Sequence, residues 1–299
     1  MASPEFTKNE TRMLTGFVIG LIVLGCLYFG GVFLLLLIAA CMYIGSKEYV
    51  EILKHKGFFP SLKIILISDI VFAVLFCINN CDFIFAAVTL AVITSFMWVL
   101  FKGRQPYIAN VATTLLGVFY GGWLTLHLFL LRGLSADGTL DISMHNSQGI
   151  GYVFFLFFVI LATDMGCYFV GRKIGKNQLA PTVSPKKTIE GAVGGFVCSV
   201  ITALCAGFLI DLPWYHAFIL GVICSVLSQI GDLCESLIKR DAGVKDSSDI
   251  IPGHGGFLDR TDSYVFTMPI MYYYLKLFIV NPPFDYASTL KGFLHGFGL

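Results

Sequence analysis

The sequence predicts an all-α protein that is integral to a membrane and crosses it with about nine helices. Of its 299 residues, 57% are hydrophobic and only 13% are charged. The mean hydropathy of +0.81 lies far above that of ordinary soluble domains. Apolar runs of about 17 to 25 residues recur along the chain, and as helices they can cross a hydrocarbon core of roughly 30 Å.

Nine such runs follow one another with short connections. The first two are short and are separated only by Gly30 and Gly31. The predicted spans cover residues 13–29, 31–46, 62–79, 83–101, 108–131, 150–171, 188–210, 215–238 and 263–280. We divide the chain into an N-terminal membrane region (1–131), a second membrane region in which the functional residues are expected (150–280) and a C-terminal tail (281–299).

The basic residues indicate the orientation of these spans. All Lys and Arg residues except Arg132, Lys276 and Lys291 fall before the first span or after the second, fourth, sixth and eighth spans. Positive residues accumulate on the cytoplasmic side of membrane proteins. The N-terminus is therefore expected in the cytoplasm and the C-terminus outside, with the functional residues in the cytoplasmic connections. The absence of a transit-peptide pattern and the short inner connections favour a bacterial inner membrane. The net charge of +1 gives no reason to expect a nucleic-acid partner.

Four acids lie within predicted spans, where an ionised side chain costs at least about 2.5 kcal/mol: Asp69, Asp164, Asp232 and Glu235. Asp232 and Glu235 are three residues apart and share a helix face, so they repel unless a cation, Lys or Arg lies between them. The alternative is an acidic pair bonded to neighbouring helices. Asp69 receives no assignment.

Asp164 begins a helix face that continues with Tyr168, Gly171 and Gly175. Close packing of helices is a sufficient explanation for the two glycines. It does not explain Asp164.

The segment "SPKKTIEG" precedes the seventh span. Ser184 or Thr188 is a candidate N-cap for that helix. Lys186 and Lys187 would then lie at the N-terminus of the helix and Glu190 in its first turn. Two lysines at a helix N-terminus suit a phosphate. They equally suit an anchor of snorkelling lysines on the cytoplasmic side.

The stretch "SLIKRDAGVKDSSDIIPGHGGFLDRTD", residues 236–262, concentrates charge of both signs. Pro252, Gly253, Gly255 and Gly256 surround His254, and glycine backbone can approach an anion closely. Basic groups bind polyphosphate, whereas carboxylates bind the Mg²⁺ that accompanies it. At a membrane surface this combination indicates phosphoryl or nucleotidyl transfer to a lipid, although gated transporters also carry mixed-charge inner loops.

The order of residues in this stretch resembles the signature of the phosphatidate cytidylyltransferase (CDP-diacylglycerol synthase) family. The matching residues are Ser236, Lys239-Arg240, Lys245-Asp246, Pro252, His254-Gly255-Gly256, Asp259-Arg260 and Asp262. "SPKKTIEG" and "DMGCYFVGRKIGK" are similar to companion motifs of the family, so the resemblance covers roughly residues 160–265. Met165 and Cys167 depart from it, because smaller residues are expected beside Asp164.

The resemblance implies transfer of CMP from CTP to phosphatidic acid, which yields CDP-diacylglycerol and pyrophosphate for phospholipid synthesis. It implies Mg²⁺ as cofactor, with K⁺ as a candidate second cation, and a homodimer in the bilayer. It also implies that Asp232 and Asp259 are the metal ligands. The lipid phosphate is expected to attack the CTP α-phosphorus in line, helped by cations and basic side chains.

The remaining candidate residues are assigned around that reaction. Asp246 and Asp262 are expected near the metal, and Lys186, Lys187, Lys239, Arg240 and Arg260 are expected to bind phosphates. His254 either donates to a phosphate, serves as a base or structures the loop. The candidate catalytic residues are Lys239, Arg240, Lys245, Asp246, His254, Arg260 and Asp262. The candidate substrate-binding residues are Asp164, Tyr168, Ser184, Lys186, Lys187, Thr188, Glu190, Ser236, Gly255 and Gly256.

Two other functions remain open from the sequence. A CTP-dependent polyprenol or phytol kinase shares the span pattern but is expected to lack the order of Lys245-Asp246 and His254-Gly-Gly. An ion-coupled secondary transporter would use Asp69, Asp164 and Asp232 as an ion relay and would show inverted repeats, which the sequence lacks.

Overall fold

A computed structural model describes residues 4–78, 83–135, 140–141, 143–144, 146–248 and 255–280. It confirms the all-α prediction. The helices are α1 (Pro4–Phe29), α2 (Gly31–His55), α3 (Leu62–Cys77), α4 (Ile84–Lys102), α5 (Tyr107–Gly117), α6 (Leu124–Gly133), α7 (Ser147–Ile174), α8 (Ile189–Leu209), α9 (Trp214–Asp241) and α10 (Leu258–Leu275). Two π-helical segments, η2 (Val118–Trp123) and η3 (Lys276–Val280), continue α5 into α6 and extend α10.

Every predicted apolar run contains a helix. Within the described ranges, seven helical segments are long and apolar enough to cross a membrane. The other two are shorter: α3 has 16 residues, and the apolar part of α1 is Gly16–Phe29. The chain is thus a polytopic membrane protein, whereas the number of nine spans and the sides of its termini stay predictions.

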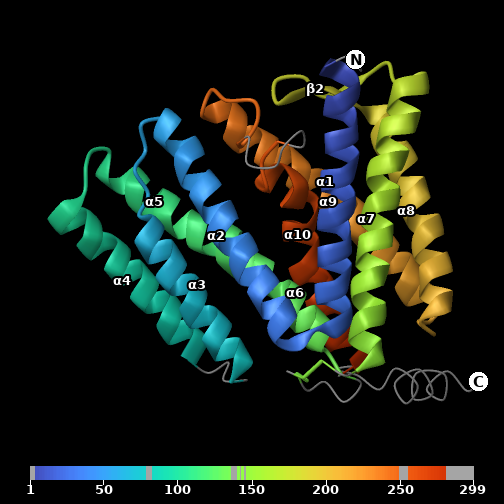
Figure 1. The fold of residues 1–299 in the computed structure, drawn as a ribbon, viewed down its shortest axis with the longest axis horizontal. Coiled ribbons are helices and arrows are strands. Elements are labelled where there is room, and N and C mark those ends of the chain that lie inside the picture. The colour runs from blue at the N-terminus through green and yellow to red at the C-terminus, as the bar shows by residue number, and fades with distance from the viewer. Residues whose placement is uncertain are drawn as a thin grey trace, which may run out of the picture.

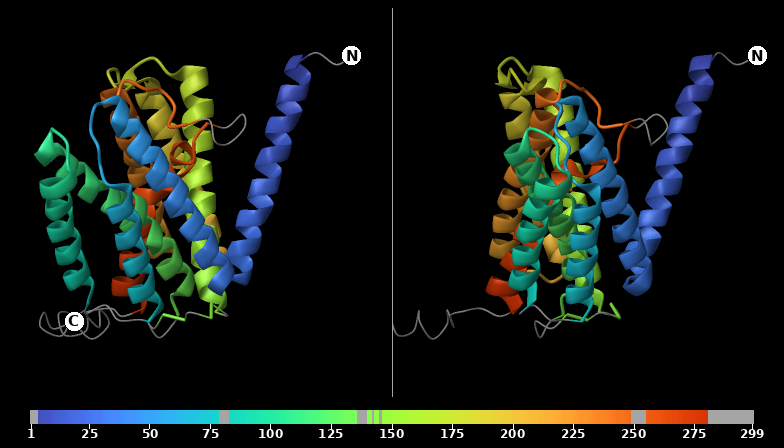
Figure 2. Two further views of the ribbon diagram at one scale, coloured as in Figure 1. Left: turned by 60° about the vertical axis from the view of Figure 1, so that its left-hand side comes forward. Right: turned by 90° about the vertical axis from the view of Figure 1, so that its left-hand side faces the viewer.

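The helices form one bundle in which successive segments run in alternating directions (Figure 1). Helix α7 packs along α8, α8 along α9, and α9 along α10, while α10 also contacts α6. Helix α1 diverges from the body of the bundle in the turned views (Figure 2). The connections that follow α2, α4, α7 and α9 gather at the end that carries the start of α1 (Figures 1 and 2). The connections predicted to be cytoplasmic therefore share one end of the bundle.

Small residues allow α7 and α8 to approach closely. A Cβ atom on Gly195 would lie 2.3 Å from Cys167 Sγ and 2.7 Å from the Thr163 carbonyl oxygen. On Gly171, a Cβ would lie 3.4 Å from Gly191 Cα. The prediction that glycines on this face serve helix packing is consistent with this geometry.

One feature was not predicted from the sequence. Between α7 and α8 the chain forms an antiparallel hairpin of β1 (Gln178–Ala180) and β2 (Ser184–Thr188). Thr188 then begins α8, because its side-chain oxygen accepts the N–H of Gly191 at 3.1 Å. Thr188 is thus the helix cap, and Ser184, the other candidate, lies at the start of β2.

The opposite end of the bundle is held by a buried arginine. Arg132, in the last turn of α6, is 1% exposed. Its guanidinium donates to the carbonyl oxygens of Leu27 at 2.9 Å, Tyr28 at 3.3 Å and Met144 at 2.8 Å. Arg132 therefore ties the corner between α1 and α2 to the connection that follows α6.

Candidate active site

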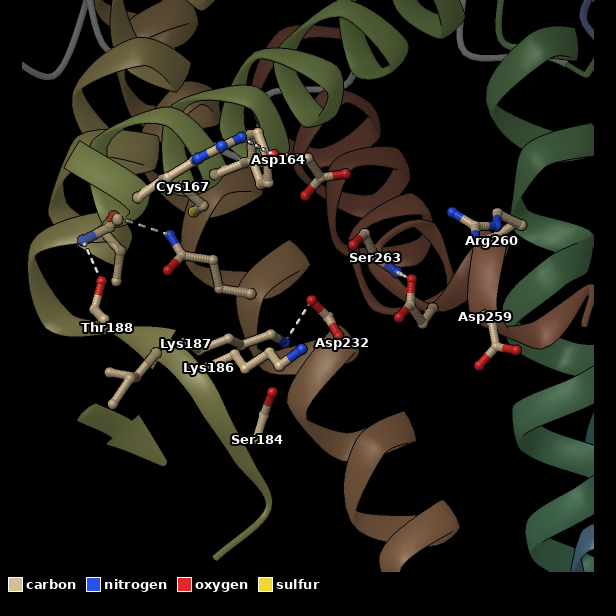
Figure 3. Close-up of a pocket in the computed structure, with 18 residues that line it drawn as sticks. Asp164, Cys167, Ser184, Lys186, Lys187, Thr188, Asp232, Asp259, Arg260 and Ser263 are labelled. Atoms are coloured by element: carbon tan, nitrogen blue, oxygen red, sulfur yellow. Dashed lines mark hydrogen bonds and ion pairs between the residues drawn. The ribbon is translucent and has the colours of Figure 1, made fainter. Parts of the chain in front are cut away.

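A cavity of about 580 Å³ lies at the hairpin end of the bundle, among α7, β2, α8, α9 and α10. It joins three segments that are far apart in the sequence (Figure 3). Ten of the predicted site residues line it: Asp164, Tyr168, Ser184, Lys186, Lys187, Thr188, Asp232, Asp259, Arg260 and Asp262.

The hairpin delivers the two lysines into this cavity. Lys186 and Lys187 extend from β2 toward Asp232 of α9 (Figure 3), and Lys187 Nζ forms an ion pair with Asp232 Oδ2. Both side chains line the cavity and are partly exposed, although the Lys187 Nζ atom itself is buried. Lys187 consequently pairs with a carboxylate of the cavity, which a lysine that only anchors the chain in lipid headgroups would not require.

Glu190 shapes the turn that precedes the hairpin. Its carboxylate accepts the backbone N–H of Lys176 at 3.0 Å and the side-chain amide of Asn177 at 2.8 Å. Glu190 is not among the residues that line the cavity. The structure therefore gives Glu190 a local contact in the connection, and its contact with substrate stays a prediction.

Three carboxylates concentrate negative charge in the cavity. Asp164 of α7, Asp232 of α9 and Asp262 of α10 interact electrostatically with one another. Asp262 is 8% exposed and accepts the backbone N–H of Ser263 at 2.7 Å. Because like charges repel in a poorly solvated site, this arrangement favours binding of a cation.

Lys239 forms a second charged cluster beside the cavity. Its side chain is 11% exposed, and its Nζ pairs with Glu235 one turn earlier on α9 and with Asp259 of α10. Asp259 also accepts the backbone N–H groups of Ser247 at 3.1 Å and Gly256 at 3.0 Å. The two acids that share a face of α9 thus each have a lysine partner: Lys187 for Asp232 and Lys239 for Glu235.

The other predicted residues lie outside the cavity lining. Arg240 donates to the carbonyl oxygens of Val183 at 3.2 Å and Val244 at 3.1 Å, which joins the end of α9 to the hairpin. Lys245 and Asp246 are exposed, and Ser236 is buried within α9. Gly255 and Gly256 lie just before α10, and Gly255 has a φ of 80°. His254 lies outside the described residues.

Sequence reasoning missed several residues that the fold brings to this region. Arg172 lines the cavity and donates to the Tyr168 hydroxyl at 2.9 Å. Gln229 also lines it, one turn before Asp232. Glu48 of α2 binds the segment before α10. Arg172 and Gln229 could have been found from the sequence, because their helical spacing puts them on the same faces as Asp164 and Asp232. Glu48 could not, because no local pattern distinguishes it from Glu51.

Asp69 lies elsewhere in the bundle. It is 2% exposed, accepts a long hydrogen bond of 3.5 Å from Ser46 Oγ, and packs against η2, where a Cβ on Gly122 would fall 1.8 Å from its Oδ1. It does not line the cavity that Asp164 and Asp232 share. An ion relay through these three acids would therefore have to extend beyond this cavity.

The cavity offers the donor atoms that a metal ion needs, but the described side chains are not arranged closely enough to form a complete metal site. Carboxylate oxygens are the ligands that Mg²⁺ prefers, and the cavity offers them from three helices. Within the described ranges, however, no three His, Cys, Asp or Glu side chains lie close enough together to hold a metal. The two predicted ligands, Asp232 and Asp259, are paired with Lys187 and Lys239.

This chain is similar to known proteins over most of its length. Residues 10–278 match the family model described as "Cytidylyltransferase family". A phosphatidate cytidylyltransferase of Synechocystis is 33% identical over 290 residues, which is 90% of this chain and 97% of that protein. The Staphylococcus haemolyticus protein of the same name is 33% identical over 275 residues, which is 88% of this chain and 97% of that protein. The Bacillus subtilis protein of the same name is 41% identical over 159 residues, which is 52% of this chain and 59% of that protein.

Proposed function

The chain belongs to the cytidylyltransferase family and is a nucleotidyltransferase, and from this premise we propose that it transfers CMP from CTP to phosphatidic acid. The products are CDP-diacylglycerol and pyrophosphate, used in phospholipid synthesis. The observation that supports this most directly is the shared cavity, in which lysines from the hairpin face carboxylates from α9 and α10.

The reaction needs positive charge around two anionic reactants. A phosphate oxygen of phosphatidic acid attacks the α-phosphorus of CTP as the bond to the β-phosphate oxygen breaks, and pyrophosphate leaves with that electron pair. Lys186, Lys187 and Arg260 line the cavity, where they reduce the repulsion and stabilise the leaving group. A phosphate monoester at pH 7 is already largely a dianion, so a protein base is not required.

Asp232 and Asp259 are proposed to hold Mg²⁺, with Asp262 beside them and K⁺ as a candidate second cation. When bound, the cation adds charge neutralisation on the phosphates. Lys187 and Lys239 are the side chains that neutralise these two carboxylates in the structure. Lys187, which lines the cavity, is therefore available to bind phosphate once Asp232 is otherwise neutralised.

The lipid substrate is proposed to enter from the bilayer. Tyr168 and Leu179 line the cavity and are 57% and 36% exposed, so apolar surface borders its opening. A lipid can then present its phosphate while its acyl chains stay in the membrane. The distribution of basic residues supports an opening at the cytoplasmic face, and the bacterial relatives favour a bacterial inner membrane. A homodimer remains part of the proposal.

The test is product formation by the purified protein in detergent, with radiolabelled CTP and with phosphatidic acid, CTP or Mg²⁺ omitted in turn. The proposal predicts that pyrophosphate and a CMP-labelled lipid form only when all three are present. Transfer of the γ-phosphate to a polyprenol would establish the kinase instead. No turnover with any nucleotide, together with ion uptake by proteoliposomes, would establish the transporter.

A further inference from the structure

Glu48, near the end of α2, is a buried carboxylate that the sequence did not identify as a site residue. It is 1% exposed. In the described part of the chain, no Lys, Arg or His forms an ion pair with it. A carboxylate in this position must be stabilised by hydrogen bonds, because burying an unpaired charge is costly. The partners of Glu48 therefore indicate its role.

Among the residues that the structure describes, the hydrogen-bond partners of Glu48 come from the segment that leads into α10. Oε1 accepts the backbone N–H of Phe257 at 2.9 Å and the hydroxyl of Ser248. Oε2 accepts the backbone N–H of Leu258 at 2.9 Å and the Ser247 hydroxyl at 3.2 Å. Each oxygen thus binds one backbone N–H and one hydroxyl, about 200 residues further along the chain.

These contacts replace a local cap on α10. The first N–H groups of a helix have no partner within the helix, and the N-cap residue of α10, Phe257, provides no side-chain cap. Glu48 supplies the acceptor from another helix. Its negative charge also lies at the positive end of the α10 dipole. The carboxylate therefore fixes where α10 begins.

The same segment is joined directly to Asp259. The Ser247 hydroxyl lies 3.2 Å from Glu48 Oε2 and 2.9 Å from Asp259 Oδ2. Gly256 fills the space beside them, because a Cβ there would lie 1.7 Å from Ser247 Oγ and 2.9 Å from Glu48 Oε2. Glu48 and Asp259 thus share one hydrogen-bonded network, and only glycine fits next to it.

We propose that Glu48 is a positioning residue for the transfer reaction: it sets the start of α10 and thereby directs Asp259, Arg260 and Asp262 into the cavity. This inference rests on the proposed function for the reaction that it names. Glu48 does not line the cavity and is not proposed to touch either substrate.

The test compares Glu48→Gln with Glu51→Gln, the same change three residues away on α2. Glu51 is 54% exposed and pairs with Lys54, so it is a matched control. A Gln side chain has one acceptor oxygen. Whichever way its amide is turned, its NH₂ faces either Phe257 N–H or Leu258 N–H. We expect kcat to fall about 10- to 100-fold, with a smaller change in KM for CTP because Lys186 and Lys187 lie on another element.

A second readout requires no substrate or metal. Hydrogen–deuterium exchange of the amides in residues 255–262 is expected to accelerate in Glu48→Gln and to stay at the wild-type rate in Glu51→Gln. Wild-type turnover in Glu48→Gln, or lost turnover with unchanged exchange in this segment, would overturn the inference. If Glu48→Gln cannot be purified folded, Glu48→Asp takes its place, because the shorter side chain cannot reach both N–H groups.

The two readouts separate this inference from the proposed function. If the wild-type protein makes no CDP-diacylglycerol, the proposed function has failed. The exchange rates then still decide whether Glu48 holds the start of α10. Unchanged exchange in both Glu48→Gln and Glu48→Asp would exclude that structural role even in an active enzyme.

Discussion

Lys239 Nζ of α9 donates to Asp259 Oδ1 of α10 at 2.5 Å, 20 residues further along the chain. The same ammonium pairs with Glu235, which is 3% exposed at its side chain. One lysine therefore compensates two carboxylates where α9 meets the start of α10. This cluster adjoins the cavity and gives Glu235 a counter-ion inside the bundle, while Asp232 on the same face of α9 pairs with Lys187.

Replacing Lys239 by Met is expected to destabilise the protein by about 3 to 5 kcal/mol, because it leaves two buried carboxylates without their counter-ion. Lys54→Met is the control, since Lys54 and Glu51 are 46% and 54% exposed and such pairs contribute about 0 to 1 kcal/mol. Unfolding of both variants in detergent measures the difference. Equal stability of the two would show that the cluster carries little free energy.

Asp232→Asn is expected to reduce pyrophosphate release at least about 100-fold. The amide keeps the shape of the side chain but loses the charge that pairs with Lys187 and is proposed to bind Mg²⁺. Asp211→Asn, at the exposed turn between α8 and α9, is the matched control and should retain wild-type turnover. Activity of Asp232→Asn within a few fold of wild type would remove Asp232 from the proposed metal site.

Arg132→Met is expected to lower stability by at least about 3 kcal/mol, because several buried carbonyl oxygens lose their donor at once. Turnover per folded molecule should stay unchanged. Arg132 binds the corner between α1 and α2, at the end of the bundle opposite β2 (Figure 1). Thermal unfolding and a rate normalised to folded protein test both parts, and a loss of normalised rate would contradict the second.

Gly195→Ala is expected to force α7 and α8 apart and to cost about 1 to 3 kcal/mol, because its Cβ would lie 2.3 Å from Cys167 Sγ. Gly20→Ala in α1 is instead expected to raise the free energy of unfolding. Nothing lies within 4 Å of that Cβ, and alanine favours the helix. The free energies of unfolding of the two variants provide the comparison. A neutral Gly195→Ala would mean that the two helices can adjust.

Much of the fold follows from local features of the sequence. Each apolar run became a helix because a segment of that composition must satisfy its backbone hydrogen bonds internally. The candidate site was also partly predictable, since Asp164, the lysines of "SPKK", Asp232 and the acids of residues 259–262 were each conspicuous in their own segment. That these segments surround one cavity is a finding of the structure.

Only the tertiary structure decided which charged groups pair across elements. The sequence placed Asp232 and Glu235 on one helix face with Lys239 one turn after Glu235, but the crossing of α9 with β2 brought Lys187 to Asp232, and its crossing with α10 brought Asp259 to Lys239. It also buried Glu48 while leaving Glu51 in solvent. Composition and periodicity determine which side chains a helix presents. The rotation and crossing of neighbouring helices determine what those side chains meet, and contacts across about 200 residues carry no local signal.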